Sequence, residues 1–568
     1  IYTGEDTLSL HDALPISINT DGIAALTSAQ VVSLTTDQVA AVSTTQLQAL
    51  TNNNLAALTT TQVQALGVTQ VPAFTTSAVV ALTSEQVAAF TTSQVLSITT
   101  TQVRALLADQ VAALTTAQVN TLDTNQLTAI TNANVAALST AQVDALGTTQ
   151  LRSLVTAQVQ SLTAAVVASL ATDKLTALTT TQVAALTADQ MGALTTSQAS
   201  AVTTTQVRVL GADQIRALST ASVAALTTDQ VQALTTSQIS NLTNTTVASF
   251  TTDQVAALST TQVRVLADSV ITGLSTTQLT SLTTGQVEVL TASQVRALTT
   301  AEVAALTTTQ VSALTSTQIA SLETADMVAM TTDQVGALNT TQVAALTVGM
   351  VTALSTDQVG ALGTTNVSAL TDTQIRALTT ASVNALSTGQ VQVLTTSQIR
   401  ALTASGVGAL STDQVGALGT DQVRALTTDN IVALSTAQVA ALSTSQLEAL
   451  TTVQVAAIAT DDIQAISTSS ISALTTSQVQ ALTTAAVNAL LTDQVAALST
   501  TQVVALTTSR VAALSTAQVV SLTTAQVQVL NVWQLTAMSE AQVRALSTTQ
   551  IAALTNDQLL GLVTQARS

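Results

Sequence analysis

Side chains that can do chemistry are scarce in this sequence of 568 residues. The only His is His11, the only Tyr is Tyr2, and there is no Cys. Ser-His-Asp and Cys-His catalysis both need residue types that the chain lacks after residue 17, and so do metal sites with His or Cys ligands. We therefore expect the chain not to be an enzyme, and to have no catalytic, cofactor-binding or metal-binding residue.

Carboxylates are the remaining candidates for chemistry. Asp461 and Asp462 form the only adjacent acidic pair in the region that follows residue 17. Paired carboxylates can do acid–base work or bind calcium. No glycine-rich loop that could hold a phosphate accompanies them, so their meaning depends on the element that carries them.

The charge, the Cys content and the apolar runs of the chain indicate which kinds of partner it can have. The formal net charge is −18 and the isoelectric point is near 4.1, which disfavours binding to nucleic acid. Without Cys there is no disulfide framework. No apolar run reaches the roughly 18 residues that a membrane-spanning helix needs, so we expect no membrane span.

A repeat of eight residues organises the chain. In the copy from Leu226 to Ala233, which we number as positions 1 to 8, the residues are Leu-Thr-Thr-Asp-Gln-Val-Gln-Ala. Position 1 is apolar at every eighth residue from Ile18 to Leu562, and no insertion or deletion interrupts the register. Position 2 is nearly always Thr or Ser, position 5 is mostly Gln, and position 6 is apolar. Such an unbroken period predicts one repeat array.

Each octad carries the signals that begin a helix. Thr or Ser followed three residues later by Gln is a capping box, and the apolar residues at positions 1 and 6 match a hydrophobic staple. Asp favours position 4, as in Asp229, and Arg favours position 7, as in Arg424, which is the order that a helix dipole prefers. We expect a helix of about seven residues, from position 3 to the next position 1, with one Thr or Ser turning the chain.

The eight-residue period argues against one continuous helix. Eight residues at about 100° each rotate the apolar set by about 80° per octad, so no apolar stripe would form. The sequence therefore predicts an all-α solenoid or superhelix with one short capped helix per octad. A β-solenoid is the alternative, because Thr and Val favour strands and three octads could form one triangular coil.

The register also places the unusual residues. Asp461 and Asp462 occupy positions 4 and 5, and we interpret them as a solvated helix start. Trp533 at position 4 should face solvent, and Phe74 and Phe90 at position 1 should fill the core locally. Pro72 at position 7 should cost one helical hydrogen bond because it has no N–H.

Residues 1–17 do not follow the repeat. This run, from Ile1 to Ser17, resembles the conceptual translation of a common short-read sequencing adapter, and the octads start immediately after it at Ile18. We expect residues 1–17 not to be native, residues 18–562 to form one uninterrupted octapeptide-repeat solenoid, and residues 563–568 to be the truncated end of the array. The native N-terminus and any targeting signal would then be missing.

Two resemblances follow from the octad. The segment Leu-Thr-x-x-Gln-Val-x-Ala-Leu resembles the opening helix of transcription-activator-like effector repeats, but those are longer and basic, and shared capping explains the match. More broadly, the Cys-free array rich in Thr, Ala and Val resembles octapeptide-repeat regions of large bacterial surface or secreted proteins, which are described as adhesin-like or haem-utilisation proteins. That resemblance implies an extracellular or cell-surface location and transfers no site residue.

We therefore expect a structural repeat array: a spacer, stalk or adhesive region of a bacterial extracellular protein, with partners unknown. The alternative is a ligand-binding solenoid whose exposed side chains at positions 3, 4 and 7 present a repeated polar lattice to a glycan, a cation or ice.

Overall fold

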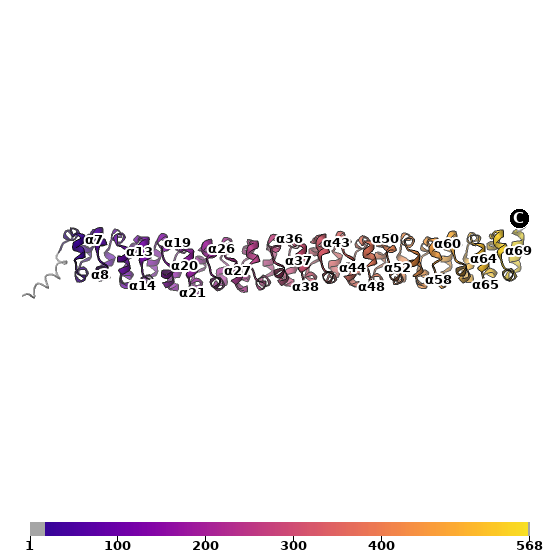
Figure 1. The fold of residues 1–568 in the computed structure, drawn as a ribbon, viewed down its shortest axis with the longest axis horizontal. Helices are drawn as coiled ribbons and strands as arrows, with labels where there is room; N and C mark the ends of the chain where they lie inside the picture. Colours follow the sequence, from indigo (N-terminus) through magenta and orange to yellow (C-terminus); the bar gives the residue numbers. More distant parts are fainter. Residues whose placement is uncertain (1–17, 566–568) are drawn as a thin grey trace, which may run out of the picture. The chain divides into compact units, whose positions relative to one another are not determined.

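The structure, a computed structural model, describes residues 18–565. Within that range it contains 67 short α-helices, one 3-10 helix and no strand (Figure 1). The all-α prediction is confirmed and the β-solenoid alternative is wrong. Residues 1–17, which carry His11, Tyr2 and the adapter-like run, lie outside the described residues. The chain divides into two compact units, Ile1–Val289 and Leu290–Ser568.

The helices follow the octad register. They begin at position 3 and mostly end at position 7 or 8, from α3 (Thr20–Ala24) to α68 (Thr548–Ala553), and α69 (Asn556–Gln565) is longer. α31 (Thr252–Ala257) is a representative helix. The Oγ1 atom of Thr251 accepts from the Gln254 N–H at 3.2 Å, and Gln254 Oε1 accepts from the Thr251 N–H at 2.8 Å. The predicted capping box is therefore confirmed.

Most of the helices end one or two residues earlier than the sequence predicts. Leu258, at the position 1 that follows α31, has φ −56° and ψ 135°, which is extended backbone. Its N–H still bonds to the carbonyl oxygen of Val255, three residues back. Two extended residues, positions 1 and 2, thus form each corner, where we expected one.

Three octads make one turn of the solenoid. In the first unit α10 (Ser84–Ala89) packs against α13 (Ala108–Ala113), three helices further along the chain. In the second unit α49 (Thr396–Ala401) packs in the same way against α46 (Asp372–Ala377) and α52 (Thr420–Ala425). Residues three octads apart therefore occupy equivalent places on neighbouring turns, which confirms a solenoid in each unit.

The core of each turn is narrow. Side chains at positions 6 and 1, such as Val103 and Leu106, are buried, and so is the position-5 Gln102. Positions 2, 3, 4 and 7 mostly face outward along the repeat. Small residues at position 8, mostly Ala, are partly buried between turns, so the interior needs no aromatic side chains to be filled.

Pro72 replaces an α-helix by a 3-10 helix. The octad that contains it forms η1 (Val71–Ala73) after a turn at residues 68–70. The predicted loss of a helical hydrogen bond is confirmed, because Pro has no N–H to donate. The segment still packs against α6 (Thr44–Ala49) and α11 (Thr92–Ser97), its neighbours on adjacent turns, so the turn of the solenoid is kept.

Candidate functional site

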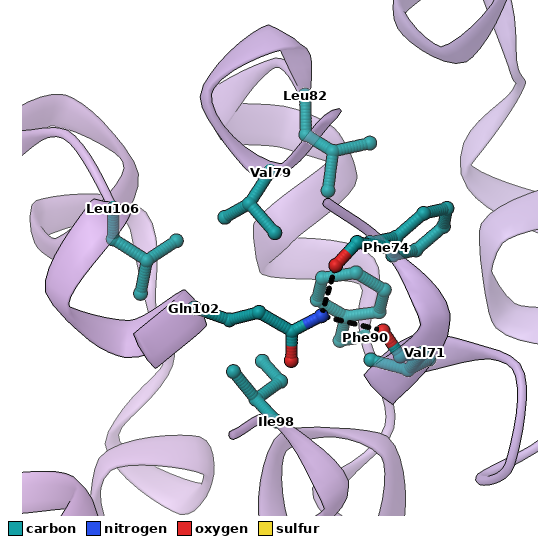
Figure 2. Close-up of a pocket in the computed structure, with 8 residues that line it drawn as sticks. All are labelled: Val71, Phe74, Val79, Leu82, Phe90, Ile98, Gln102 and Leu106. Carbon is teal, nitrogen blue, oxygen red and sulfur yellow. Dashed lines mark hydrogen bonds between the residues drawn. The ribbon is translucent and has the colours of Figure 1, made fainter. Parts of the chain in front are cut away.

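The most regular arrangement of polar atoms in the molecule is built around the buried Gln at position 5. Gln102 lies in the first turn of α12 (Thr100–Ala105), where its Oε1 atom accepts from the N–H of Thr99 at 2.9 Å. Its Nε2 atom donates to the carbonyl oxygens of Val71 (3.0 Å) and Phe74 (2.8 Å), as the dashed lines of Figure 2 show. One amide thus joins a helix start to the corner one turn earlier.

The same contacts recur along both units. In the first unit Gln254 donates to Leu226 (2.6 Å) and Val223 (3.0 Å), and in the second Gln390 donates to Leu362 (2.6 Å) and Val359 (3.1 Å). The acceptors are 28 and 31 residues earlier in both cases, and they belong to the end of a helix and its corner. The Val223 carbonyl already accepts from the Leu226 N–H at 3.2 Å, so Gln254 adds a second bond there. At Leu226 it supplies a donor to a corner carbonyl of the kind that helix ends leave without an intrahelical partner. We call this repeated set of contacts the glutamine corner.

Other side chains at position 5 donate in the same place when they can. Asn430 donates from Nδ2 to the Leu402 carbonyl at 3.2 Å, and Ser222 donates from Oγ to the Leu194 carbonyl at 2.9 Å. Arg510 donates from Nε to the Leu482 carbonyl. The carbonyl of the position-1 residue one turn earlier is therefore the constant feature of the corner, and the donor varies.

Near η1 the core contains a cavity of about 10 Å³. Figure 2 shows Phe74, Phe90, Ile98 and Leu106 around it, with Gln102 between them. A volume of this size holds one water molecule at most, and both Nε2 donations of Gln102 are already made within the protein. The cavity is a packing defect beside the Pro-containing octad, and the expected core-filling role of the Phe side chains holds.

The acidic pair separates in the structure. Asp461 is exposed, but Asp462 is buried, and its Oδ1 atom accepts from the hydroxyl of Thr436 at 2.7 Å. Our interpretation of both residues as a solvated helix start is wrong for Asp462, because position 5 points into the corner. The described residues contain no group of three or more His, Cys, Asp or Glu side chains that could hold a metal ion.

Two further buried acids, Glu302 and Asp326, were missed by sequence reasoning, although the octad register places both at position 5. Glu302 Oε2 accepts from the N–H (2.7 Å) and the hydroxyl (2.9 Å) of Thr299. Asp326 Oδ2 accepts from the N–H of Glu323 at 2.8 Å. Burial raises the pKa of Asp326 above its ordinary value, the nearby Glu323 charge also raises it, and the hydrogen bond from the Glu323 N–H opposes both.

The outward surface is polar and lightly charged. Trp533 is 77% exposed, as predicted. An open hollow of about 510 Å³ lies beside Gly419, lined among others by Thr395, Thr420 and Asp421. Among the described residues three ion pairs form, one of them between turns, where Lys174 Nζ lies 2.9 Å from Asp144 Oδ1. None of the described helices is long and apolar enough to cross a membrane.

A family model matches the repeat region of the chain. The profile described as the ALTTAQ repeat matches more than half of the chain, in segments spread over both units. They are residues 43–76, 119–156, 207–244, 293–324, 319–356, 373–404, 396–428, 425–460, 455–492, 479–508 and 533–564. No curated protein matches the chain significantly.

Proposed function

The chain belongs to the ALTTAQ repeat family, and from this premise we propose that it serves as a non-catalytic spacer, stalk or adhesive region of a bacterial extracellular protein. The chain is a structural repeat array of short helices. The spacer role is our inference from how the array is held together.

The glutamine corner carries the proposal. Gln254 ties its own turn to the preceding turn through Leu226 and Val223, and the position-5 residues of most other octads do the same. Each turn therefore depends on its immediate neighbours, and stability in such solenoids is approximately a sum of repeat and interface terms. An array of this kind can change length by whole octads and keep its structure, which suits a component whose useful property is reach.

The surface supports an exposed location. Positions 2, 3, 4 and 7 are outward and mostly Thr, Ser, Ala and Gln, and the formal net charge of −18 favours solubility. The chain also has no Cys that could pair wrongly in an oxidising compartment.

Immunolabelling tests the location. Antibodies raised against the array should label intact cells that produce the protein, and the labelled epitopes should be lost when those cells are treated with protease. An antibody to a cytoplasmic protein serves as the control. Label that needs permeabilised cells and resists external protease would overturn the proposal.

A second candidate function, a repeated polar lattice for a glycan, a cation or ice, draws support from the exposed Thr side chains and the hollow beside Gly419. Its test is co-sedimentation of the full chain with insoluble polysaccharides. Thr395→Val together with Thr420→Val should weaken binding. Thr251→Val together with Thr276→Val, at the same octad positions in the other unit, is the matched control. Equal binding by all variants would exclude the hollow as the contact.

A further inference from the structure

One line of corners in the second unit lacks the amide donor on three successive turns. Glu302, Asp326 and Met350 all occupy position 5, each three octads after the one before. All three side chains are buried. On the next turn Gln374 restores the amide and donates to Leu346 at 2.7 Å. Two acids and a thioether thus stand where donors to backbone carbonyls normally stand.

Asn430 shows a side-chain geometry that Asp326 shares in part. Its Oδ1 atom accepts from the Thr427 N–H at 3.0 Å, while its Nδ2 atom donates to the Leu402 carbonyl one turn earlier. Asn366 makes the same donation to Leu338 at 2.6 Å. Asp326 keeps the first half of this pattern, because its Oδ2 atom accepts from the Glu323 N–H.

The second half differs in chemistry. Asp has the shape of Asn, so an Asp326 side chain in the orientation of Asn430 puts its other oxygen in the place of the amide nitrogen. The residue equivalent to Leu402 at that corner is Leu298. A carboxylate can only accept, whereas a protonated carboxyl group has one O–H to donate. In that orientation an ionised Asp326 would bring two acceptors together, which is costly.

We propose that Asp326 is a proton-dependent hydrogen-bond donor in this corner. Its protonated carboxyl group donates a hydrogen bond to the carbonyl oxygen of Leu298, and this hydrogen bond is lost when the carboxyl group loses its proton. The proton replaces the amide hydrogen of Gln or Asn at the other corners, and no covalent step is involved.

The charged groups around Asp326 are mostly acidic. Glu323 lies in its own corner, and Glu302 lies on α37 (Thr300–Ala305), which packs against α40 (Thr324–Ala329). α43 (Val348–Ala353), on the other side, brings no titratable group, and α39 (Ser316–Ser321), the preceding helix, brings none. Asp333 on the following helix is exposed.

A basic residue, Arg296, lies on a helix of the preceding turn. Arg296 is carried by α36 (Ala292–Ala297), the helix that ends at the Leu298 corner, and its Nε atom donates to the Ser321 carbonyl at 3.4 Å. Burial and the charge of Glu323 favour the protonated form of Asp326, and the hydrogen bond from the Glu323 N–H opposes them.

The direction of the pH effect follows from linkage. Because the pKa of Asp326 is raised above its ordinary value of 3.8 in the folded chain, the folded state binds more protons than the unfolded state. The stabilisation is therefore fully present below pH 3.8 and is lost as the pH rises through the raised pKa. The corner at Asp326 is therefore most stable at acidic pH.

Hydrogen–deuterium exchange on the full chain tests the proposal locally. Peptides covering residues 295–303 and 320–330 should be less protected at neutral pH than in acid, after correction for intrinsic rates. The protection factor of these peptides should fall about tenfold for each unit by which the pKa of Asp326 in the folded chain exceeds its value in the unfolded chain. In Asp326→Asn, the protection should no longer depend on pH and should match that of the wild type in acid.

Asp333→Asn is the matched control, because it removes the same charge one octad away from an exposed side chain and should keep the wild-type pH dependence. An Asp326→Asn chain that keeps the pH dependence, or that is less protected than the wild type at neutral pH, would overturn the proposal. So would neutral-pH protection that rises when calcium is added to the wild type and not to Asp326→Asn, because a cation would then occupy the corner in place of the proton.

Discussion

The Nε2 atom of Gln102 lies 2.8 Å from the carbonyl oxygen of Phe74, a residue 28 positions earlier in the chain. The same side chain accepts from the N–H of Thr99 through Oε1. One amide therefore satisfies a donor at the start of one helix and an acceptor at the corner of the preceding turn. Because both groups are buried, leaving either without a partner costs more than the hydrogen bond gains.

Gln102→Leu should lower the free energy of unfolding by about 2 kcal/mol, because it leaves the Thr99 N–H and the carbonyls of Val71 and Phe74 without this partner. Gln102→Glu keeps the acceptor oxygen and removes only the donor, so it should be destabilising at neutral pH and milder in acid. Urea denaturation measures both. Gln64→Leu, at an exposed position 7, is the control and should change the free energy of unfolding little. An equal loss of stability in Gln64→Leu would contradict a stabilising role of the glutamine corner.

The helix starts could be predicted from the sequence, but the hydrogen bonds between neighbouring turns could not. The Thr251–Gln254 pair predicts its own capping box, because both partners are three residues apart and local chemistry decides the bond. The Nε2 contact of Gln254 with Leu226 depends on how many octads make a turn. The backbone angles of the two corner residues set that number, and no side-chain type in the octad specifies them.

The burial of Asp462 was missed for the same reason. Its octad marks it as a first-turn acid, which in an isolated helix would be solvated. Only the neighbouring turn, which brings the Thr436 hydroxyl within 2.7 Å, makes it a buried acceptor. The exposed Trp533, by contrast, could be predicted, because position 4 faces outward on a single helix whatever the turn does.

Thr436→Val should destabilise the second unit by about 1–3 kcal/mol, because it removes the donor that Asp462 uses in a buried place. Asp462→Asn should make the Val substitution almost harmless, since an Asn at this position can donate to the Leu434 carbonyl as Asn430 does to Leu402. A double-mutant cycle in urea measures the coupling. Thr412→Val, also at position 3, is the control, and additive effects in the cycle would contradict the predicted contact.

Pro72→Ala should convert η1 into an α-helix and raise the free energy of unfolding by about 1 kcal/mol. The substitution supplies an N–H for the carbonyl of Val68, and the greater freedom of the unfolded chain offsets part of the gain. Slower hydrogen exchange in residues 70–74 would report the change. Arg104→Ala, at the same octad position in a regular helix, should show no such gain. If exchange in residues 70–74 stays as fast in Pro72→Ala, the turn at residues 68–70 and not the Pro keeps this octad irregular.

Deleting one whole octad should preserve the first unit, whereas deleting half of one should not. Removal of residues 226–233 brings Leu218, another position-1 residue, to the place that Leu226 holds relative to Gln254, so the donor still meets a corner carbonyl. Removal of residues 226–229 brings Ser222, a position-5 residue, to that place, and the apolar anchors lose their register as well.

Far-UV circular dichroism and limited proteolysis compare the two deletions. The whole-octad deletion should keep the helical spectrum and the thermal midpoint, because every remaining Gln still finds a corner one turn earlier. The half-octad deletion should lower the midpoint and open new cleavage sites near the junction, where donors and apolar anchors no longer match. Equal damage from both deletions would show that the octad is not the unit by which this array can change its length.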